Sequence, residues 1–154
     1  MALTRNKSVI PGAQGLRFAI VASRYNHQYV DSMLCAAEEV LALAHAKTVK
    51  IVRVPGAFEI PVAAARLARS GKFDAVMALA LILRGETLHA EHIGLAVSHG
   101  LTSIAIETGV PQVHEVVIAD NVAQARKRCL DKRYNKGLEA AVTAIQIART
   151  IKEL

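Results

Sequence analysis

A run of nine apolar residues, Ala75 to Leu83, limits more than any other feature how this chain can fold. Because the run does not alternate with polar residues, a strand formed from it must be covered on both faces. We predict this strand from Asp74 to Leu83, and further strands at Arg17 to Ser23, Val49 to Val54 and Val113 to Ala119. The apolar run is also too short for a transmembrane helix, which needs about 20 residues.

Stretches in which apolar residues recur at helical spacing separate these strands. Asn26 is the expected N-cap of the first stretch, Gly71 ends the second, and Gly109 and Pro111 end the third. Strands that alternate with helices form βαβ units, whose right-handed connections wind into one sheet. We therefore predict an α/β fold, a three-layer α/β/α sandwich around a four-stranded parallel sheet with flavodoxin-like winding. The predicted helices are Val30 to Ala44, Pro61 to Ala68, Ile93 to Ala105, Val122 to Leu130 and Leu138 to Lys152.

The chain has 154 residues, which suits one domain over residues 1–154 that begins with an extended arm over residues 1–15. Hydrophobic residues make up 53% of the chain, more than a lone domain of this size easily buries, and aromatic residues only 4%. We therefore expect aliphatic interfaces between subunits. The net charge of +6 is scattered along the chain without interleaved aromatic residues, so we expect no nucleic-acid binding.

The cysteine and histidine positions give little support for a metal or a disulfide. Cys35 and Cys129 lie far apart and lack metal-ligand spacing, so a disulfide framework, a zinc ribbon and an iron–sulfur site are excluded. His89 and His92 share one helical face, but no third ligand accompanies them. We expect no metal, no cofactor and, because the N-terminus lacks a secretory signal, a cytoplasmic protein without membrane contact.

Open parallel α/β sheets bind their ligands at the carboxyl ends of the strands, where this chain places its polar and aromatic residues. Tyr25 and Phe58 offer flat faces for a planar ring, and Glu59 offers a hydrogen-bond acceptor. The amides of residues 85–87 lie at a helix start and suit an anion. His89, one turn into that helix, has the side chain best suited to proton transfer near neutral pH.

Each of these residues also has a structural interpretation. Tyr25 and Phe58 could simply pack at the starts of helices, Glu59 could interact with the dipole of a helix in its first turn, and Arg84 could be a surface cation. One basic cluster fits either a solvated helix face or a phosphate site: Arg126, Lys127, Arg128, Lys132, Arg133 and Lys136.

Four blocks of sequence together resemble the lumazine synthase family of riboflavin biosynthesis. They are SRYN at Ser23 to Asn26, VPGAFEIP at Val54 to Pro61, RGETLH at Arg84 to His89 and NKGLEAA at Asn135 to Ala141. The resemblance runs from about Leu16 to the C-terminus, and the order and spacing of the blocks fit the family.

The resemblance implies an enzyme that condenses 5-amino-6-(D-ribitylamino)uracil with 3,4-dihydroxy-2-butanone 4-phosphate. The products are 6,7-dimethyl-8-ribityllumazine, phosphate and water, and neither a metal nor an organic cofactor takes part. The reaction passes through an imine, loss of phosphate and closure of the second ring. The family assembles as homo-oligomeric pentamers, twelve of which close into an icosahedral shell in some members.

The resemblance also implies roles for individual residues. Tyr25 would stack on the pyrimidine ring, Ala57 and Glu59 would orient the ring and its ribityl chain, and the backbone of Leu81, Ile82 and Leu83 would pair with the edge of the ring. The phosphate would be held by Gly85, Glu86 and Thr87.

Three further roles concern catalysis and the neighbouring subunit. His89 would move protons during imine formation and elimination, and Arg128 would reach in from the neighbouring subunit to clamp the phosphate. Lys136 would lie near the substrate.

Some positions depart from the family pattern. His114 and Glu115 replace Phe-Gly in the fourth strand, Tyr25 replaces the usual Phe, and Ala90 replaces an aromatic residue beside His89. His114 can stack on a ligand as a flat ring or add a charge at mildly acidic pH.

Two other function classes compete with the enzyme. A catalytically weak shell-forming or flavin-binding paralogue would keep the fold and the pocket, but the intact set of His89, Arg128 and Lys136 favours an enzyme. A receiver-like signalling domain needs acidic residues at the strand ends, and here the first strand ends in Ser23 and Arg24.

Overall fold

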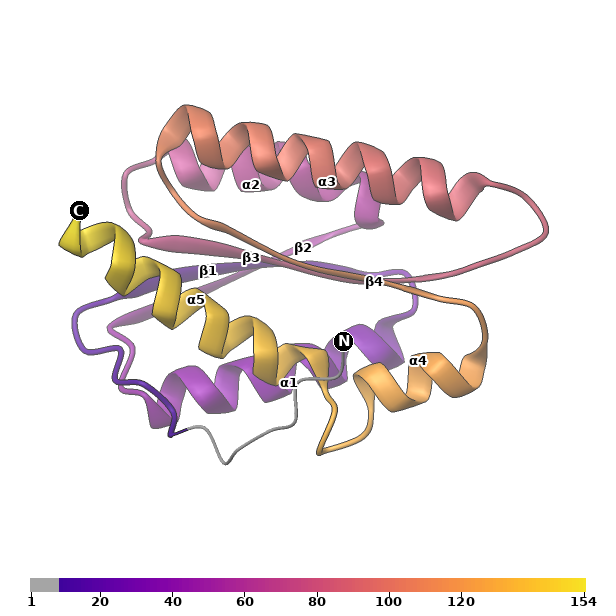
Figure 1. The fold of residues 1–154 in the computed structure, drawn as a ribbon, viewed down its shortest axis with the longest axis horizontal. Coiled ribbons are helices and arrows are strands. Elements are labelled where there is room, and N and C mark those ends of the chain that lie inside the picture. Colours follow the sequence, from indigo (N-terminus) through magenta and orange to yellow (C-terminus); the bar gives the residue numbers. More distant parts are fainter. Residues whose placement is uncertain (1–8) are drawn as a thin grey trace.

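A four-stranded parallel sheet lies between two layers of helices in a computed structural model, which describes residues 9–154 (Figure 1). The strand order is β2-β1-β3-β4, so β1 and β3 are central and β2 and β4 form the edges. This arrangement confirms the predicted α/β sandwich and its winding. The strands are β1 (Arg17–Ser23), β2 (Thr48–Val54), β3 (Ala75–Leu83) and β4 (Gln112–Ala119).

The helices divide between the two faces of the sheet, and all five predicted helices are present (Figure 1). Helix α3 begins at His89, one turn before the start of the apolar pattern, because its first turn carries polar residues. The helix start predicted at residues 85–87 is therefore wrong: these residues precede α3, and His89 is the first helical residue and does not lie one turn into the helix. No helix within residues 9–154 is both long and apolar enough to cross a membrane. One face is covered by η1 (Ala57–Glu59), α2 (Ile60–Arg69) and α3 (His89–Thr108), and the other by α1 (His27–Leu43), α4 (Val122–Cys129) and α5 (Lys136–Glu153).

Each face of the sheet packs against its own apolar core. Successive side chains of a strand point to opposite faces, and the first seven residues of β3 are all buried, as its unbroken apolar pattern predicts. Toward α1 and α5 the core includes Phe18, Ile20, Met77 and Leu79. Toward α2 and α3 it includes Ala19, Val21, Val76 and Ala78.

Part of the predicted N-terminal arm, residues 1–8, lies outside the described residues. The following segment lies against the end of α1, where the amide of Ala13 donates to the carbonyl of Ala44 at 2.8 Å. The amide of Lys47 in turn donates to the carbonyl of Leu16 at 2.8 Å. These bonds tie the start of β1 to the connection between α1 and β2.

Candidate active site

A cavity of about 630 Å³ opens at the carboxyl ends of the strands, where sequence reasoning placed the site. We call it the main cavity. Most of the residues predicted to bind the planar ring line it, and so does the predicted proton carrier. Its lining comprises Ser23, Tyr25, Asn26, Gly56, Ala57, Phe58, Glu59, Leu81, Ile82, Leu83, His89, His92 and Ile93.

The different lengths of two neighbouring strands expose backbone groups at the floor of the main cavity. Pairing of β1 with β3 ends at Leu79, whereas pairing of β3 with β4 continues to Leu83. The amide of Arg84 donates to the carbonyl of Ala119 in β4. Because alternate residues direct their backbone groups to opposite sides of a strand, Leu81 and Leu83 direct theirs away from β4, into the space beyond β1.

Asn26 occupies part of that space. Its side-chain amide donates to the carbonyl of Leu81 at 2.8 Å, while its backbone has a φ of 56°, in the left-handed region that asparagine tolerates. The predicted N-cap position of α1 is therefore right, but the predicted capping bond is absent among the described residues. The side chain instead joins the end of β1 to β3 and leaves the backbone of Leu83 facing the main cavity.

Gly56 makes room for the ring of Tyr25. A Cβ atom at Gly56 would lie 2.8 Å from Cδ2 of Tyr25 and 3.1 Å from Oε2 of Glu59, both closer than ordinary packing allows. The amide of Gly56 donates to the same Oε2 at 2.9 Å, which fixes the Glu59 carboxylate at the rim. The amide of Tyr25 donates to the carbonyl of Pro55 at 3.0 Å. The short loop after β2 thus fixes the positions of the Tyr25 ring and of the Glu59 carboxylate.

Two histidines from the first turns of α3 line the main cavity. His89 and His92 lie three residues apart, so they share one helical face. Sequence reasoning assigned no substrate role to His92, Ile93 or Asn26, although the spacing from His89 could have identified His92. Within residues 9–154 no group of three His, Cys, Asp or Glu side chains is arranged to hold a metal ion.

The predicted phosphate loop lies beside the main cavity and does not line it. Gly85, Glu86 and Thr87 are exposed, and a Cβ atom at Gly85 would meet nothing within 4 Å. Thr87 Oγ1 accepts a bond from the amide of His89 at 3.4 Å, so the loop leads directly into α3. An anion bound at these amides would lie next to His89.

Arg128 and Lys136 do not line the main cavity of their own chain. They come from α4 and α5, on the opposite face of the sheet from α3. The start of α5 is fixed by Asn135, whose side chain donates to the carbonyl of Cys129 at 2.6 Å and accepts from the amide of Gly137 at 2.8 Å. Lys136 Nζ lies 2.6 Å from an oxygen of Glu139.

Glu115 of β4 lies on the same face as these cations. Burial raises its pKa to about 7; the positive charges of Lys136 and Arg128 oppose this shift, and the negative charge of Glu139 adds to it. Burial, and next the charge of Glu115, raise the pKa of Cys129 to about 11. A carboxyl that gains a proton near neutral pH therefore stands among the predicted anion-binding residues.

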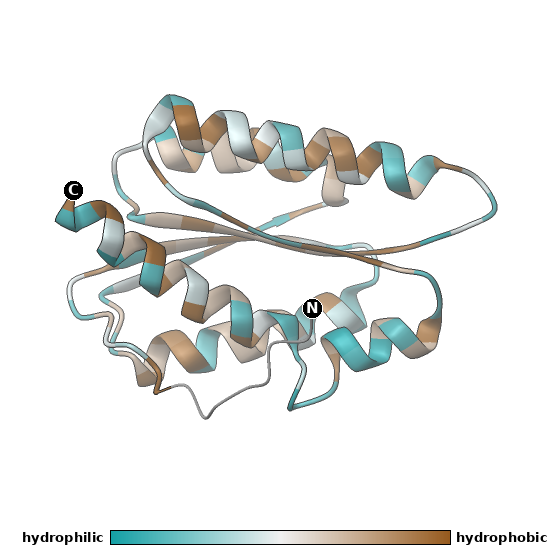
Figure 2. Ribbon diagram, viewed as in Figure 1, coloured by the Kyte–Doolittle hydropathy of each residue, from teal (hydrophilic) through white to brown (hydrophobic). Residues whose placement is uncertain are grey.

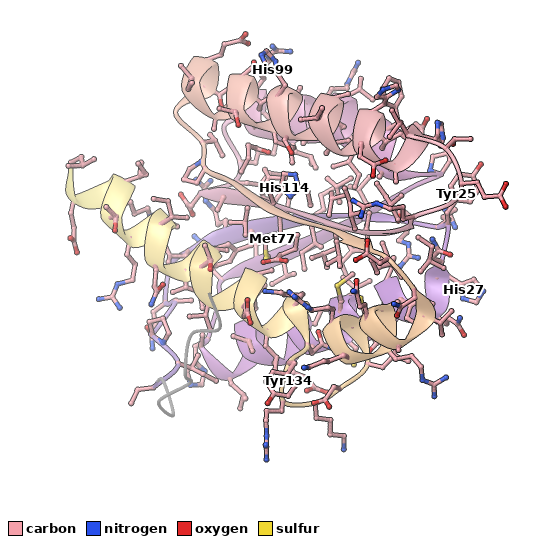
Figure 3. The ribbon with its side chains drawn as sticks, turned by 45° about the vertical axis from the view of Figure 1, so that its right-hand side comes forward. Tyr25, His27, Met77, His99, His114 and Tyr134 are labelled. Carbon is pink, nitrogen blue, oxygen red and sulfur yellow. The ribbon has the colours of Figure 1, made fainter. Side chains whose placement is uncertain are left out.

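His114 lies under α3, away from the end of the sheet where Tyr25 is found (Figure 3). Its Nδ1 accepts from the amide of Val116 at 3.3 Å, and its Nε2 lies 2.8 Å from the hydroxyl of Ser98. That hydroxyl donates its proton to the carbonyl of Gly94, so it accepts a hydrogen bond from Nε2 of His114. The predicted stacking residue thus makes its bonds within its own chain, outside the main cavity.

Comparison with known proteins agrees with the sequence blocks. A sequence model of the family described as 6,7-dimethyl-8-ribityllumazine synthase matches residues 15–152. The chain is also 43% identical over 144 residues to the 6,7-dimethyl-8-ribityllumazine synthase of Aquifex aeolicus (strain VF5). That alignment covers 92% of this chain and 94% of the relative, so it extends over nearly the whole of both sequences.

Proposed function

The chain belongs to the 6,7-dimethyl-8-ribityllumazine synthase family, and from this premise we propose which of its residues carry out the family's reaction. It is a transferase of riboflavin biosynthesis that condenses the ribitylaminouracil with the butanone phosphate. The observation that carries the residue assignment is the main cavity, whose lining includes Tyr25, Ala57, Glu59 and His89 at one sheet end.

The ribitylaminouracil occupies the main cavity. Its ring stacks against Tyr25 with Phe58 as a second flat wall, and its polar edge pairs with the free backbone groups of Leu83. Ile82 and Ala57 supply apolar surface around it. The ribityl hydroxyls extend toward the Glu59 carboxylate, which accepts their hydrogen bonds.

The butanone phosphate binds with its phosphate at residues 85–87. The amides of residues 85–87, which directly precede α3, and the Thr87 hydroxyl donate to the phosphate oxygens, and the dipole of α3 favours an anion near its N-terminus. This position places the ketone between the loop and the ring, within reach of the amine that attacks it.

His89 serves as the proton carrier of the reaction. Its protonated imidazole donates to the hydroxyl that leaves as water when the imine forms. The imidazole left neutral by this donation then accepts a proton from a carbon of the imine as the C–O bond to the phosphate breaks and the phosphate leaves, so one side chain serves both steps.

A second copy of the chain completes the site. Arg128, Lys136 and His114 lie outside the main cavity of their own chain, so we assign them to the cavity of a neighbouring subunit. Such a heterologous contact generates closed rings, and a pentamer is the form that we propose. Helix α3 carries several hydrophobic residues, coloured brown on the ribbon of Figure 2. Two large ones remain exposed for such contacts: Leu95 is 71% exposed and Ile106 is 79% exposed.

The same contacts within a pentamer are compatible with several larger assemblies, which a mass measurement distinguishes. Pentamers, decamers of two pentamers and shells of 60 subunits differ in mass enough for light scattering to separate them. Both cysteines are free thiols, in keeping with the cytoplasmic location that we propose.

The experiment that tests the function mixes purified protein with both substrates and follows lumazine absorbance and fluorescence. We expect turnover that His89→Ala and Arg128→Ala each reduce strongly. Binding of riboflavin or lumazine without turnover would instead identify the flavin-binding paralogue, with His114 and Glu115 as the departures to revert first.

A further inference from the structure

Arg84 connects three elements around the predicted phosphate loop. It is the first residue after β3, and its Nε lies 2.6 Å from Oε1 of Glu91 in the first turn of α3. One terminal nitrogen lies 2.5 Å from Oδ1 of Asp120, which directly follows β4. A planar guanidinium holds two carboxylates at fixed angles, which a single ammonium group cannot do.

The two partners of Arg84 are themselves held in place. Asp120 donates its amide to Oε1 of Gln124 at 2.8 Å, and its Oδ2 accepts from the side-chain amide of Gln124 at 3.0 Å. The amide of Gln124 is in turn bonded to the N-cap Asn121 at 2.9 Å. Asp120 is therefore held at the start of α4, and its ion pair with Arg84 fixes the residue that begins the loop.

The Arg84–Glu91 pair spans the segment that would hold the phosphate. Residues 85–88 lie between the two partners, and none of them belongs to a helix or strand. Residues 85–88 are all exposed, and a Cβ atom at Gly85 would meet nothing within 4 Å, so little side-chain packing supports this loop. The ion pair thus holds the two ends of this loop together.

Arg84 also offsets negative charge beside an anion site. Glu91 Oε2 is buried and has no hydrogen-bond partner among the described residues, whereas Oε1 of the same carboxylate forms the ion pair with Arg84. Without Arg84, the carboxylates of Glu91 and Asp120 would lack this cation beside the predicted phosphate loop, and uncompensated negative charge near the loop disfavours binding of an anion.

We propose that Arg84 is a positioning residue for the phosphate-bearing substrate: it holds residues 85–88 in their binding conformation and neutralises Glu91 and Asp120 beside the phosphate. The inference rests on the proposed function for the location of the phosphate. It assigns Arg84 no contact with substrate, since its side chain is engaged by the two carboxylates.

The test compares Arg84→Ala and Arg84→Lys with wild type and with Arg69→Ala as a matched control. Arg69 forms an ion pair with Glu107 at 3.1 Å near the other end of α3, far along the chain from the loop. In Arg84→Ala we expect the KM for the butanone phosphate to rise about tenfold and the KM for the ribitylaminouracil to stay within about twofold. Arg84→Lys keeps the positive charge but cannot hold both carboxylates in the same geometry, so its KM for the butanone phosphate should lie between those of wild type and Arg84→Ala.

Binding of inorganic phosphate, measured by calorimetry, gives a second readout that needs no turnover. Arg84→Ala should weaken it about tenfold, and Arg69→Ala should leave both phosphate binding and kinetics unchanged. An unchanged phosphate KM with unchanged phosphate affinity overturns the inference, as does an equal rise in both KM values with a lowered Tm. A wild-type protein without turnover refutes the proposed function, while phosphate affinity still decides the role of Arg84.

Discussion

The side-chain amide of Asn26 bonds to the backbone carbonyl of Leu81 at 2.8 Å, and this bond joins the ends of the two central strands. It uses the carbonyl that β1 would have engaged had β1 continued beyond Ser23. The next backbone groups on that side of β3, those of Leu83, remain directed into the main cavity. The bond thus leaves the backbone of Leu83 as the partner that we propose for the edge of the planar substrate.

Removal of this bond should weaken binding of the ribitylaminouracil. Asn26→Gly keeps the left-handed backbone at little strain and deletes the side chain together with its hydrogen bond to Leu81, so we expect the KM for the ribitylaminouracil to rise about tenfold and the free energy of unfolding to fall by about 1 kcal/mol. His45 has a φ of 60° at the far end of α1, and His45→Gly is the matched control. Equal KM values in both variants would contradict the role given to Asn26.

Gly56 should be sensitive to the addition of one methyl group. In Gly56→Ala the new Cβ, 2.8 Å from the Tyr25 ring, displaces the stacking face, and we expect the KM for the ribitylaminouracil to rise about tenfold or more. Gly100→Ala is a comparably tight control, because its Cβ would lie 3.1 Å from Pro61, outside the main cavity. Steady-state kinetics with the ribitylaminouracil varied would reveal the difference; normal kinetics in Gly56→Ala would speak against stacking on Tyr25.

Glu115 should make stability depend on pH. Its pKa is about 7 in the folded chain and near 4.5 when unfolded, so the folded state binds its proton more tightly. The protonated Glu115 carboxyl therefore makes its full contribution to the free energy of unfolding below about pH 4.5, and this contribution is lost as the pH rises through 7. Glu115→Gln should exceed wild type in unfolding free energy by about 1–3 kcal/mol at pH 8 and by little at pH 4.5.

Urea unfolding at one protein concentration measures this difference at both pH values. Glu38→Gln, at an exposed position on α1, serves as the control and should not change the pH dependence. A gain in Glu115→Gln that is the same at pH 4.5 and pH 8 would show that the carboxyl does not titrate between them.

The fold was predictable because strand and helix periods are local properties of the sequence. The unbroken apolar run over residues 75–83 identified the most buried strand, and Gly71 and Gly109 ended helices where expected, both with positive φ. The position of the main cavity was predictable as well, since polar residues after parallel strands gather at one end of a sheet.

The details that escaped prediction depend on contacts between distant residues. Asn26 has the sequence position of a capping residue, and only the extra length of β3 over β1 gives its side chain a different partner. Glu115 lies in an apolar strand, and its high pKa comes from burial beneath α4 and α5. Arg84 resembles an ordinary surface cation until Glu91 and Asp120 are brought beside it.

A subunit-mixing experiment tests the central claim, a lumazine synthase site shared between two copies of the chain. His89→Ala and Arg128→Ala subunits with different tags are co-expressed, and assemblies that carry both tags are purified. With random mixing, about one quarter of the sites combine an intact His89 from one subunit with an intact Arg128 from its neighbour. Turnover of the mixed assembly should reach about a quarter of the wild-type rate, whereas a rate no higher than that of the two separate variants would contradict the shared site.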